Sequence, residues 1–403
     1  AGNPPDPRVI SAGNALGWKL LPKFAATKPE GNVFFSPYSI AAAASMAYNG
    51  AGGQTKAEMA RALGLGGLSL AEINTANARQ LERLNYADPK VQVSVANSLW
   101  ADDQFPLRKD FVERLRNGYA AEAATLDLQS SSAPGHINGW VSRNTGGKIE
   151  NIVGPFGPLD ALVLANAIYF HGEWSTVFKK ENTRQQPFHL SDGTEKQVQM
   201  MFQGAKCRYL RGDDFQAVCL PYGFKTVSMY VFLPYTEQEA QFAADFSRER
   251  SKAAEVHASP GLTDWLQRLD AKRWDAWMQG FHPATGSLSL PRFRVEYTAP
   301  LKDALKAAGM HLAFREFQAD FKDMTTVPDT IPYISQAQHR AFVDVDEEGT
   351  TAAAVTTMTF TKARDRAHSD FRMVVDHPFF CAIRDDVSGA VLFAGLIYDP
   401  VSR

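Results

Sequence analysis

The sequence predicts one α+β domain whose sheets are large and either mostly antiparallel or mixed. Helix signals are concentrated in the first third of the chain, strand signals dominate the remainder, and no regular strand–helix alternation indicates βαβ units. With 403 residues, 45% of them hydrophobic, the chain can bury a large core. No long linker or internal repeat divides it, so residues 1–403 are expected to form a single domain.

The early helices carry clear start and stop signals. Ser36 is a suitable N-cap before a proline, and Gly50 fits the end of that helix. Thr55 and Glu58 have capping-box spacing at the start of the next helix, which Gly64 would close. Three later stretches also have helical patterns: residues 109–123, 261–281 and 300–309.

Strand signals begin near residue 91. Residues 91–101 alternate between apolar and polar side chains, as a half-buried strand does. Residues 161–170 form a nearly continuous apolar run whose length and β-branched content favour a buried strand over a helix. Further strands are expected at 227–233, 287–295, 341–345, 379–384 and 390–397.

Charge and motifs argue against several classes of function. A net charge of −2 gives no indication of nucleic-acid or anionic-membrane binding, and no apolar run approaches the ~18 residues of a membrane span. The odd cysteine count (Cys207, Cys219 and Cys381) without C-x-x-C favours buried thiols over disulfides or zinc. The sequence lacks the common nucleophile, phosphate-binding and zinc-protease motifs. It also has no pair of histidines with metal-ligand spacing. We therefore expect a protein that is not an enzyme and has no cofactor or metal.

A segment near the C-terminus is unusual. Residues 347–361 read EEGTTAAAVTTMTFT, with no proline and no charge between Glu348 and Lys362. An extended chain here would keep every N–H free for a β-ladder and would bury no ion. Alternate side chains would share one face: Thr350, Ala352, Ala354, Thr356, Met358 and Phe360. The segment fits a strand that can be added to a sheet; taken alone, it fits a strand followed by a Thr-rich linker equally well.

Motifs in order along nearly the whole chain resemble the serpin family. EEGTTAAA (347–354) resembles the hinge that opens the family's reactive-centre loop, and residues 334–349 resemble the strand leading into it. Other stretches similar to family landmarks are 32–40, 146–153, 164–174, 289–310, 376–385 and 391–400. The resemblance implies a serpin fold of three β-sheets with about eight or nine helices and an exposed reactive-centre loop at about 347–376.

The resemblance also implies site residues. The hinge would comprise Glu347, Glu348, Gly349, Thr350, Thr351, Ala352, Ala353 and Ala354. A polar cluster beneath the opening sheet, called the shutter, would contain Ser36, Ser39, Asn166 and His339. The breach, where the loop first enters the sheet, would contain Trp174, and Arg292 with Glu347. Residue types alone also allow a purely structural role for three of these residues. Ser36 could be only a helix cap, His339 a core histidine, and Arg292 a solvated strand residue.

The implied function is inhibition of serine or cysteine proteases by suicide-substrate trapping, in which the cleaved loop inserts into the main sheet. Family spacing places the reactive bond at Ala363–Arg364, and cuts after Lys362, Arg364 or Arg366 stay open. The small Ala363 favours elastase-like or subtilisin-like targets, whereas the basic neighbours fit a trypsin-like one. Thr350 would enter the sheet first, and in the intact protein we expect it near the surface.

The alternative is a non-inhibitory serpin that acts as a carrier or chaperone. Such members usually have a charged, bulky or proline-containing hinge, which this chain lacks. The stretch 236–285 is longer than usual for the family, and we assign it no function. No dense basic patch suggests a polyanion cofactor, and the expected partner is a target protease of a monomeric protein. A chain that begins at Ala1 fits one whose signal peptide has been removed, so a secreted or cell-envelope location is expected.

Overall fold

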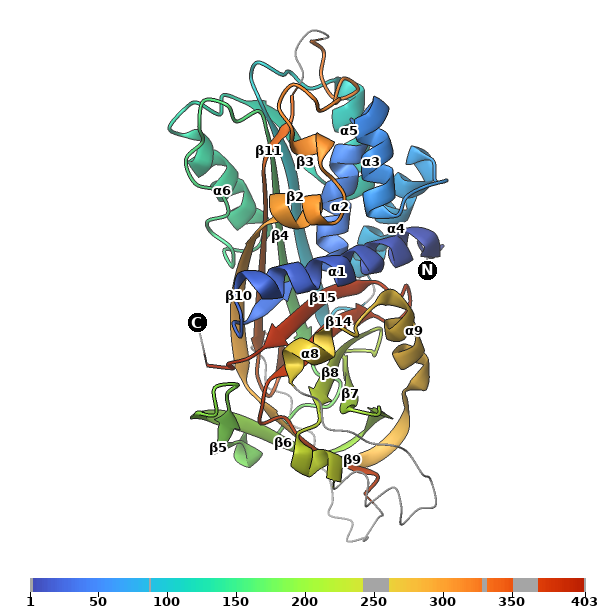
Figure 1. The fold of residues 1–403 in the computed structure, drawn as a ribbon, viewed down its shortest axis with the longest axis vertical. Helices are drawn as coiled ribbons and strands as arrows, with labels where there is room; N and C mark the ends of the chain where they lie inside the picture. Colours follow the sequence, from blue (N-terminus) through green and yellow to red (C-terminus); the bar gives the residue numbers. More distant parts are fainter. Residues whose placement is uncertain (1–2, 87, 242–260, 328–331, 351–368, 402–403) are drawn as a thin grey trace.

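The computed structural model describes residues 3–86, 88–241, 261–327, 332–350 and 369–401. Nine α-helices lie wholly within these ranges, residues 237–241 are also helical, and the helices pack around two hydrogen-bonded networks of strands (Figure 1). The helices are α1 (Pro7–Thr27), α2 (Pro37–Tyr48), α3 (Gly53–Leu63), α4 (Leu70–Tyr86), α5 (Lys109–Tyr119), α6 (Ala133–Asn144), α8 (Leu262–Leu266), α9 (Ala271–Gly280) and α10 (Leu301–Ala307). None of these helices combines the length and the apolar character that crossing a membrane requires.

The central sheet has six strands in the order β10-β11-β12-β4-β2-β3. Their bounds are β10 (Phe293–Pro300), β11 (Ile334–Val345), β12 (Gly349–Thr350), β4 (Leu162–Glu173), β2 (Val91–Asp102) and β3 (Glu122–Leu126). Over most of their length β11 and β4 are direct parallel neighbours, from the pair Ile334–Leu162 to the pair Phe342–Tyr169. Beyond that point the two-residue β12 lies between them and is antiparallel to both.

The second network has nine strands, and the long strand β6 joins its two portions. The strands are β1 (Val33–Phe35), β5 (Arg184–His189), β6 (Glu195–Arg211), β7 (Phe215–Tyr222), β8 (Val227–Pro234), β9 (His282–Pro291), β13 (Phe371–Val374), β14 (Phe379–Asp385) and β15 (Val391–Ile397). One portion contains β7, β8, β14, β15 and β1, and the other contains β5, β9 and β13. Most of β6 pairs with β5 and β9, and its last residues also pair with β7. When the two portions are counted separately, the network and the central sheet agree with the expected three sheets.

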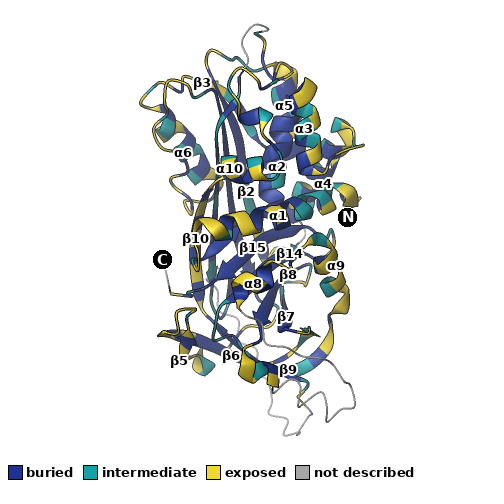
Figure 2. Ribbon diagram, in the orientation of Figure 1, coloured by how far each residue is buried: buried dark blue, intermediate teal, exposed yellow. Residues whose placement is uncertain are grey.

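The two faces of the central sheet are covered by different helices. On one face, α6 packs Ile137 and Val141 against Val163 and Ala167 of β4 in a separate apolar cluster. On the other face, Leu162, Leu164 and Ile168 of β4 join the main core. Helix α2 contributes to the same core, and nearly all of its residues are buried. Figure 2 shows the inner strands of this sheet largely in the colour of buried residues, and β4 is buried along nearly its whole length. Both faces being covered explains the nearly continuous apolar run that predicted β4.

Most predicted elements are confirmed, with some corrections. Ser36 caps α2 by accepting from the Ser39 N–H, and Gly64 closes α3 at φ +70°. The capping box at Thr55 is wrong, because α3 begins at Gly53 and Thr55 instead accepts from the Asp320 N–H. Residues 261–281 form two helices instead of one, since Asp270 caps a second start.

The predicted strand 287–295 is also wrong as a single element. The chain passes from β9 to β10 at Arg292, and the two strands belong to different sheets. Arg292 donates its backbone N–H to Gln199 O at this crossing. Its side chain is therefore placed at the junction of the two networks.

Candidate functional site at the hinge and beneath the central sheet

The first hinge residues are already seated in the central sheet. Gly349 pairs with Glu173, and Thr350 pairs with both Gly172 of β4 and Val345 of β11. Thr350 is fully buried, so the expectation that it lies near the surface is wrong. The chain turns back after Val345 and enters the gap where β4 and β11 separate, which the strand pattern alone could not indicate.

Gly349 makes this close approach feasible. Its φ of +156° is one that side-chain-bearing residues rarely adopt. A Cβ on Gly349 would lie 2.0 Å from the carbonyl oxygen of Gly172. A residue without a side chain is therefore required at this position for the hinge to remain seated.

Asp346 shapes the turn that brings the hinge into the gap. Its Oδ1 accepts from the N–H groups of Glu348 (2.9 Å) and Gly349 (3.2 Å), while its own N–H donates to Gly349 O (2.8 Å). Burial raises the pKa of Asp346, and the two N–H donors oppose that rise. Sequence reasoning missed this residue, although an aspartate three residues before a glycine is typical of turns.

The breach segment holds the hinge by its backbone. Trp174 donates its N–H to Glu348 O and its Nε1–H to Asp346 O, both at 2.9 Å, and the Phe178 N–H donates to Glu347 O at 2.9 Å. The carbonyl groups of residues 346–348, just before β12, thus all accept hydrogen bonds from residues 174–178, which directly follow β4. The structure brings Trp174 and the first hinge residues into direct contact.

Glu347 is a buried carboxylate with two partners. Its side chain is 1% exposed, and Oε1 accepts from Arg292 Nη2 (2.6 Å) and Nε (3.0 Å) and from Thr183 Oγ1 (2.5 Å). Burial alone would raise the pKa of Glu347, but the hydrogen bonds from Arg292 and Thr183 outweigh it, so the pKa lies below its ordinary value. Glu348 pairs instead with the exposed Lys180 (2.6 Å), a contact that solvent weakens.

The four predicted shutter residues form one buried network. Asn166 Nδ2 donates to Ser39 Oγ (2.5 Å), and Asn166 Oδ1 accepts from His339 Nδ1 (2.5 Å). His339 Nε2 accepts from the Ser36 N–H (3.1 Å), so the imidazole is neutral with its proton on Nδ1. Burial lowers the pKa of His339 to about 3. The first turn of α2 is thereby tied to both β4 and β11.

Asn97 of β2 belongs to this network, and sequence reasoning missed it. Its Oδ1 accepts from Asn166 Nδ2 (2.5 Å), and it lies directly opposite Asn166 in the β2–β4 ladder, as His339 does in the β4–β11 ladder. The Nδ2 group of Asn97 is buried without a partner in the described residues. The sequence did contain a signal for this residue. Asn97 is the polar residue on a face of the predicted strand that otherwise carries apolar side chains, such as Val95 and Leu99.

The predicted site therefore forms two clusters along the same strand pair. Hinge and breach residues meet where β12 begins, and the shutter lies six residues earlier in β4, which corresponds to roughly 20 Å. The rest of the hinge and the reactive bond lie outside the described residues: Thr351, Ala352, Ala353, Ala354, Lys362, Ala363, Arg364 and Arg366.

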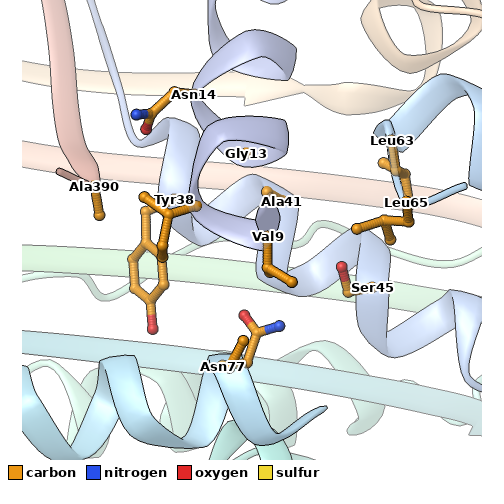
Figure 3. A pocket seen from close by; sticks show the side chains of 12 residues that line it. Val9, Gly13, Asn14, Tyr38, Ala41, Ser45, Leu63, Leu65, Asn77 and Ala390 are labelled. Carbon is orange, nitrogen blue, oxygen red and sulfur yellow. The ribbon is translucent and has the colours of Figure 1, made fainter. Parts of the chain in front are cut away.

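A small hollow also borders α2, outside these two clusters. Figure 3 shows it between α1 and α2, with Tyr38, Ser45 and Asn77 among the polar residues of its lining. The buried Tyr38 hydroxyl has no partner in the described residues, and the hollow has room for little more than one water molecule. We assign no ligand to it. The described residues also bring together no cluster of three His, Cys, Asp or Glu suited to a metal.

Comparisons with known proteins give a consistent result. The family model described as "Serpin (serine protease inhibitor)" matches residues 11–400. The leukocyte elastase inhibitor of Bos taurus is 32% identical over 380 residues, which cover 92% of this chain and 94% of that protein. The crystal structure of the thermophilic serpin tengpin in its native state has a TM-score of 0.85 and 26% identity, covering 99% of this chain and 95% of tengpin. Human thyroxine-binding globulin bound to thyroxine has a TM-score of 0.83 at 24% identity (98% and 99% covered), a likeness of fold alone.

Proposed function

The chain belongs to the serpin family, and we propose that it inhibits serine proteases as a suicide substrate. The target attacks the reactive-centre loop, an acyl-enzyme forms, and the cleaved loop inserts between β4 and β11 before the ester is hydrolysed. Strand insertion of this kind is a recognised mode of sheet recognition for serpins in general. The observation that carries the proposal is β12, which already places Gly349 and Thr350 between these two strands.

The energetics favour insertion once the loop is cut. Opening the sheet breaks one ladder, between residues 334–342 of β11 and 162–169 of β4. An inserted strand then forms two new ladders, one with each neighbour. Each ladder hydrogen bond contributes about 1 kcal/mol net, so the gain exceeds the loss. The uncut loop is tethered at both ends, which makes the intact state kinetically trapped.

The register of β12 predicts where the reactive bond would lie after insertion. Ala363 follows Thr350 by 13 residues, and Leu159 precedes Gly172, the partner of Thr350, by 13 residues. An unbroken antiparallel register would therefore bring Ala363 level with Leu159, just beyond the start of β4. Leu159 is 63% exposed, so a protease attached there would be held outside the sheet.

The target class is also a proposal. Ala363 as the residue before the cut favours an elastase-like or subtilisin-like protease, and the relative named a leukocyte elastase inhibitor is consistent with this. Cleavage after Lys362, Arg364 or Arg366 by a trypsin-like protease, or trapping of a cysteine protease, remains open to the same test. We further propose a monomer that is secreted or located in the cell envelope.

The decisive experiment is incubation with elastase, subtilisin, trypsin and papain, followed by denaturing electrophoresis. An inhibitory serpin gives a complex that survives denaturation with at least one of them, together with inactivation of that protease. The matched control is the same panel treated with protein cleaved beforehand, whose loop is no longer available. Cleavage of the intact protein by these proteases without any covalent complex would contradict the proposal and favour a carrier or chaperone.

A further inference from the structure

A buried hydroxyl pair connects the hinge to the wall of the breach. The Tyr222 hydroxyl lies 2.8 Å from Thr350 Oγ1, and either group can act as the donor. Both residues are fully buried, so water does not compete for either hydroxyl. Burial raises the pKa of Tyr222 well above its ordinary value, so the phenol stays protonated and can donate at any physiological pH.

The Tyr222 ring is held rigidly on three sides. It stacks on Trp174 with the ring centroids 4.4 Å apart and lies edge-on to Phe170 at 5.0 Å. A Cβ on Gly172 would come within 2.9 Å of the ring, so this glycine makes room for it. The adjacent Gly223 N–H donates to Glu173 O (2.8 Å), which fixes the backbone beside β4. The hydroxyl therefore has one position available, and that position faces Thr350.

We propose that Tyr222 is a positioning residue for loop insertion, because its hydroxyl seats Thr350 and so fixes the register in which the rest of the loop enters. The proposal rests on the proposed inhibitory function and adds a specific residue to it. A seated Thr350 means that insertion continues from residue 351 in an established ladder. An unseated hinge must first find its place during the lifetime of the acyl-enzyme.

Register matters because strand side chains alternate between the two faces of a sheet. A slip of one residue would send Thr351 and the residues that alternate with it to the face intended for Thr350. It would also misplace every later backbone partner along β4 and β11. The hydrogen bond between Tyr222 and Thr350 is made only in the correct register, so it favours that register by roughly the fivefold to tenfold factor that one hydrogen bond gives.

The test is a double-mutant cycle that uses Tyr222→Phe, Thr350→Val and the combined variant. Each single change leaves one buried hydroxyl without a partner, whereas the combined change leaves none. The quantity measured is the number of inhibitor molecules consumed per protease inactivated. Tyr119→Phe is the matched control, because it also removes a buried phenol that donates a hydrogen bond (to Asn74, 2.8 Å) but lies in α5, away from the hinge.

We expect each single variant to slow insertion roughly fivefold to tenfold, the factor that one lost hydrogen bond gives, and the stoichiometry to rise accordingly. The combined variant should lose no more than either single variant, because the same hydrogen bond is absent from all three, and Tyr119→Phe should inhibit with unchanged stoichiometry. Additive losses in the cycle, or unchanged stoichiometry in Tyr222→Phe, would overturn the proposal.

A second measurement does not depend on inhibition. Hydrogen exchange of the Thr350 amide should be slow in the intact protein, faster in Tyr222→Phe, and unchanged in Tyr119→Phe. Equal protection in Tyr222→Phe would overturn the role of Tyr222. If the protein traps no protease but the exchange result holds, the proposed function fails while the seating of Thr350 stands.

Discussion

His339 Nδ1 lies 2.5 Å from Asn166 Oδ1, and this hydrogen bond ties β11 to β4 midway along their parallel pairing. Nε2 of the same imidazole accepts from the Ser36 N–H. Protonation of the imidazole would place a hydrogen on Nε2, which could then no longer accept this hydrogen bond. The closed sheet therefore depends on a neutral histidine.

This dependence predicts weaker stability in mild acid. The pKa of His339 is about 3 in the folded protein and about 6.5 when unfolded, so its contribution is complete above pH 6.5 and is lost as the pH falls toward 3. Each pH unit below 6.5 costs about 1.4 kcal/mol. Melting temperature measured from pH 7 to pH 5 should fall less steeply in His339→Gln than in the parent, and the exposed-site control His311→Gln should follow the parent. Identical slopes in all three proteins would disprove the assignment.

Thr350→Arg should convert the inhibitor into a substrate. A guanidinium cannot occupy the fully buried Thr350 position without a cost of several kcal/mol, so the two residues of β12 should leave the gap. Folding should survive, since β12 contributes only two residues to the sheet. We expect cleavage at the parental bond, release of active protease and a many-fold rise in stoichiometry, whereas Thr350→Ser should still inhibit. Unchanged stoichiometry in Thr350→Arg would show that insertion does not begin at this residue.

The reactive bond should be Ala363–Arg364. Mass spectrometry of the C-terminal peptide released from the denatured complex should find a fragment that begins at Arg364. Fragments beginning at Ala363, Asp365 or Ala367 would indicate instead a cut after Lys362, Arg364 or Arg366. A fragment that begins outside residues 363–367 would contradict both the family spacing and the register that places Ala363 level with Leu159.

Cleavage within residues 362–367 should raise the melting temperature sharply. The inserted strand replaces one ladder with two and adds on the order of ten hydrogen bonds at about 1 kcal/mol each. Differential scanning calorimetry of intact and nicked protein provides the measurement, and nicked Thr350→Arg, which should not insert, is the control. Equal melting temperatures for intact and nicked parent would count against the inhibitory mechanism.

Local signals in the sequence were sufficient where the structure is local. Ser36 before Pro37 predicted the start of α2, and the apolar run at 161–170 predicted β4, because caps and burial depend on neighbouring residues. The family resemblance supplied the pairing of Arg292 with Glu347, which no spacing argument could have provided, since 55 residues separate them.

The remainder depends on tertiary register. Asn97 joins the shutter only because the β2–β4 ladder sets it opposite Asn166. The burial of Thr350 requires both the Asp346 turn and a gap between two strands that are distant in sequence, and Tyr222 reaches it from a third strand. These relationships arise from how the sheet is assembled, and no single segment of the chain encodes them.

The parallel contact of β4 with β11 gives the closed sheet a mismatch of strand direction. Each of these strands is antiparallel to its outer neighbour, β2 or β10, and they share a direction only with each other. A chain continuing from β12 would run against both, so one slanted parallel ladder would give way to two antiparallel ladders, whose hydrogen bonds are perpendicular to the strands and slightly stronger per residue. In the proposed mechanism, part of the driving force for insertion would thus come from the change in strand direction between hydrogen-bonded neighbours, independent of side chains. It follows that loop substitutions which retain every N–H can change the target protease without removing this part of the driving force.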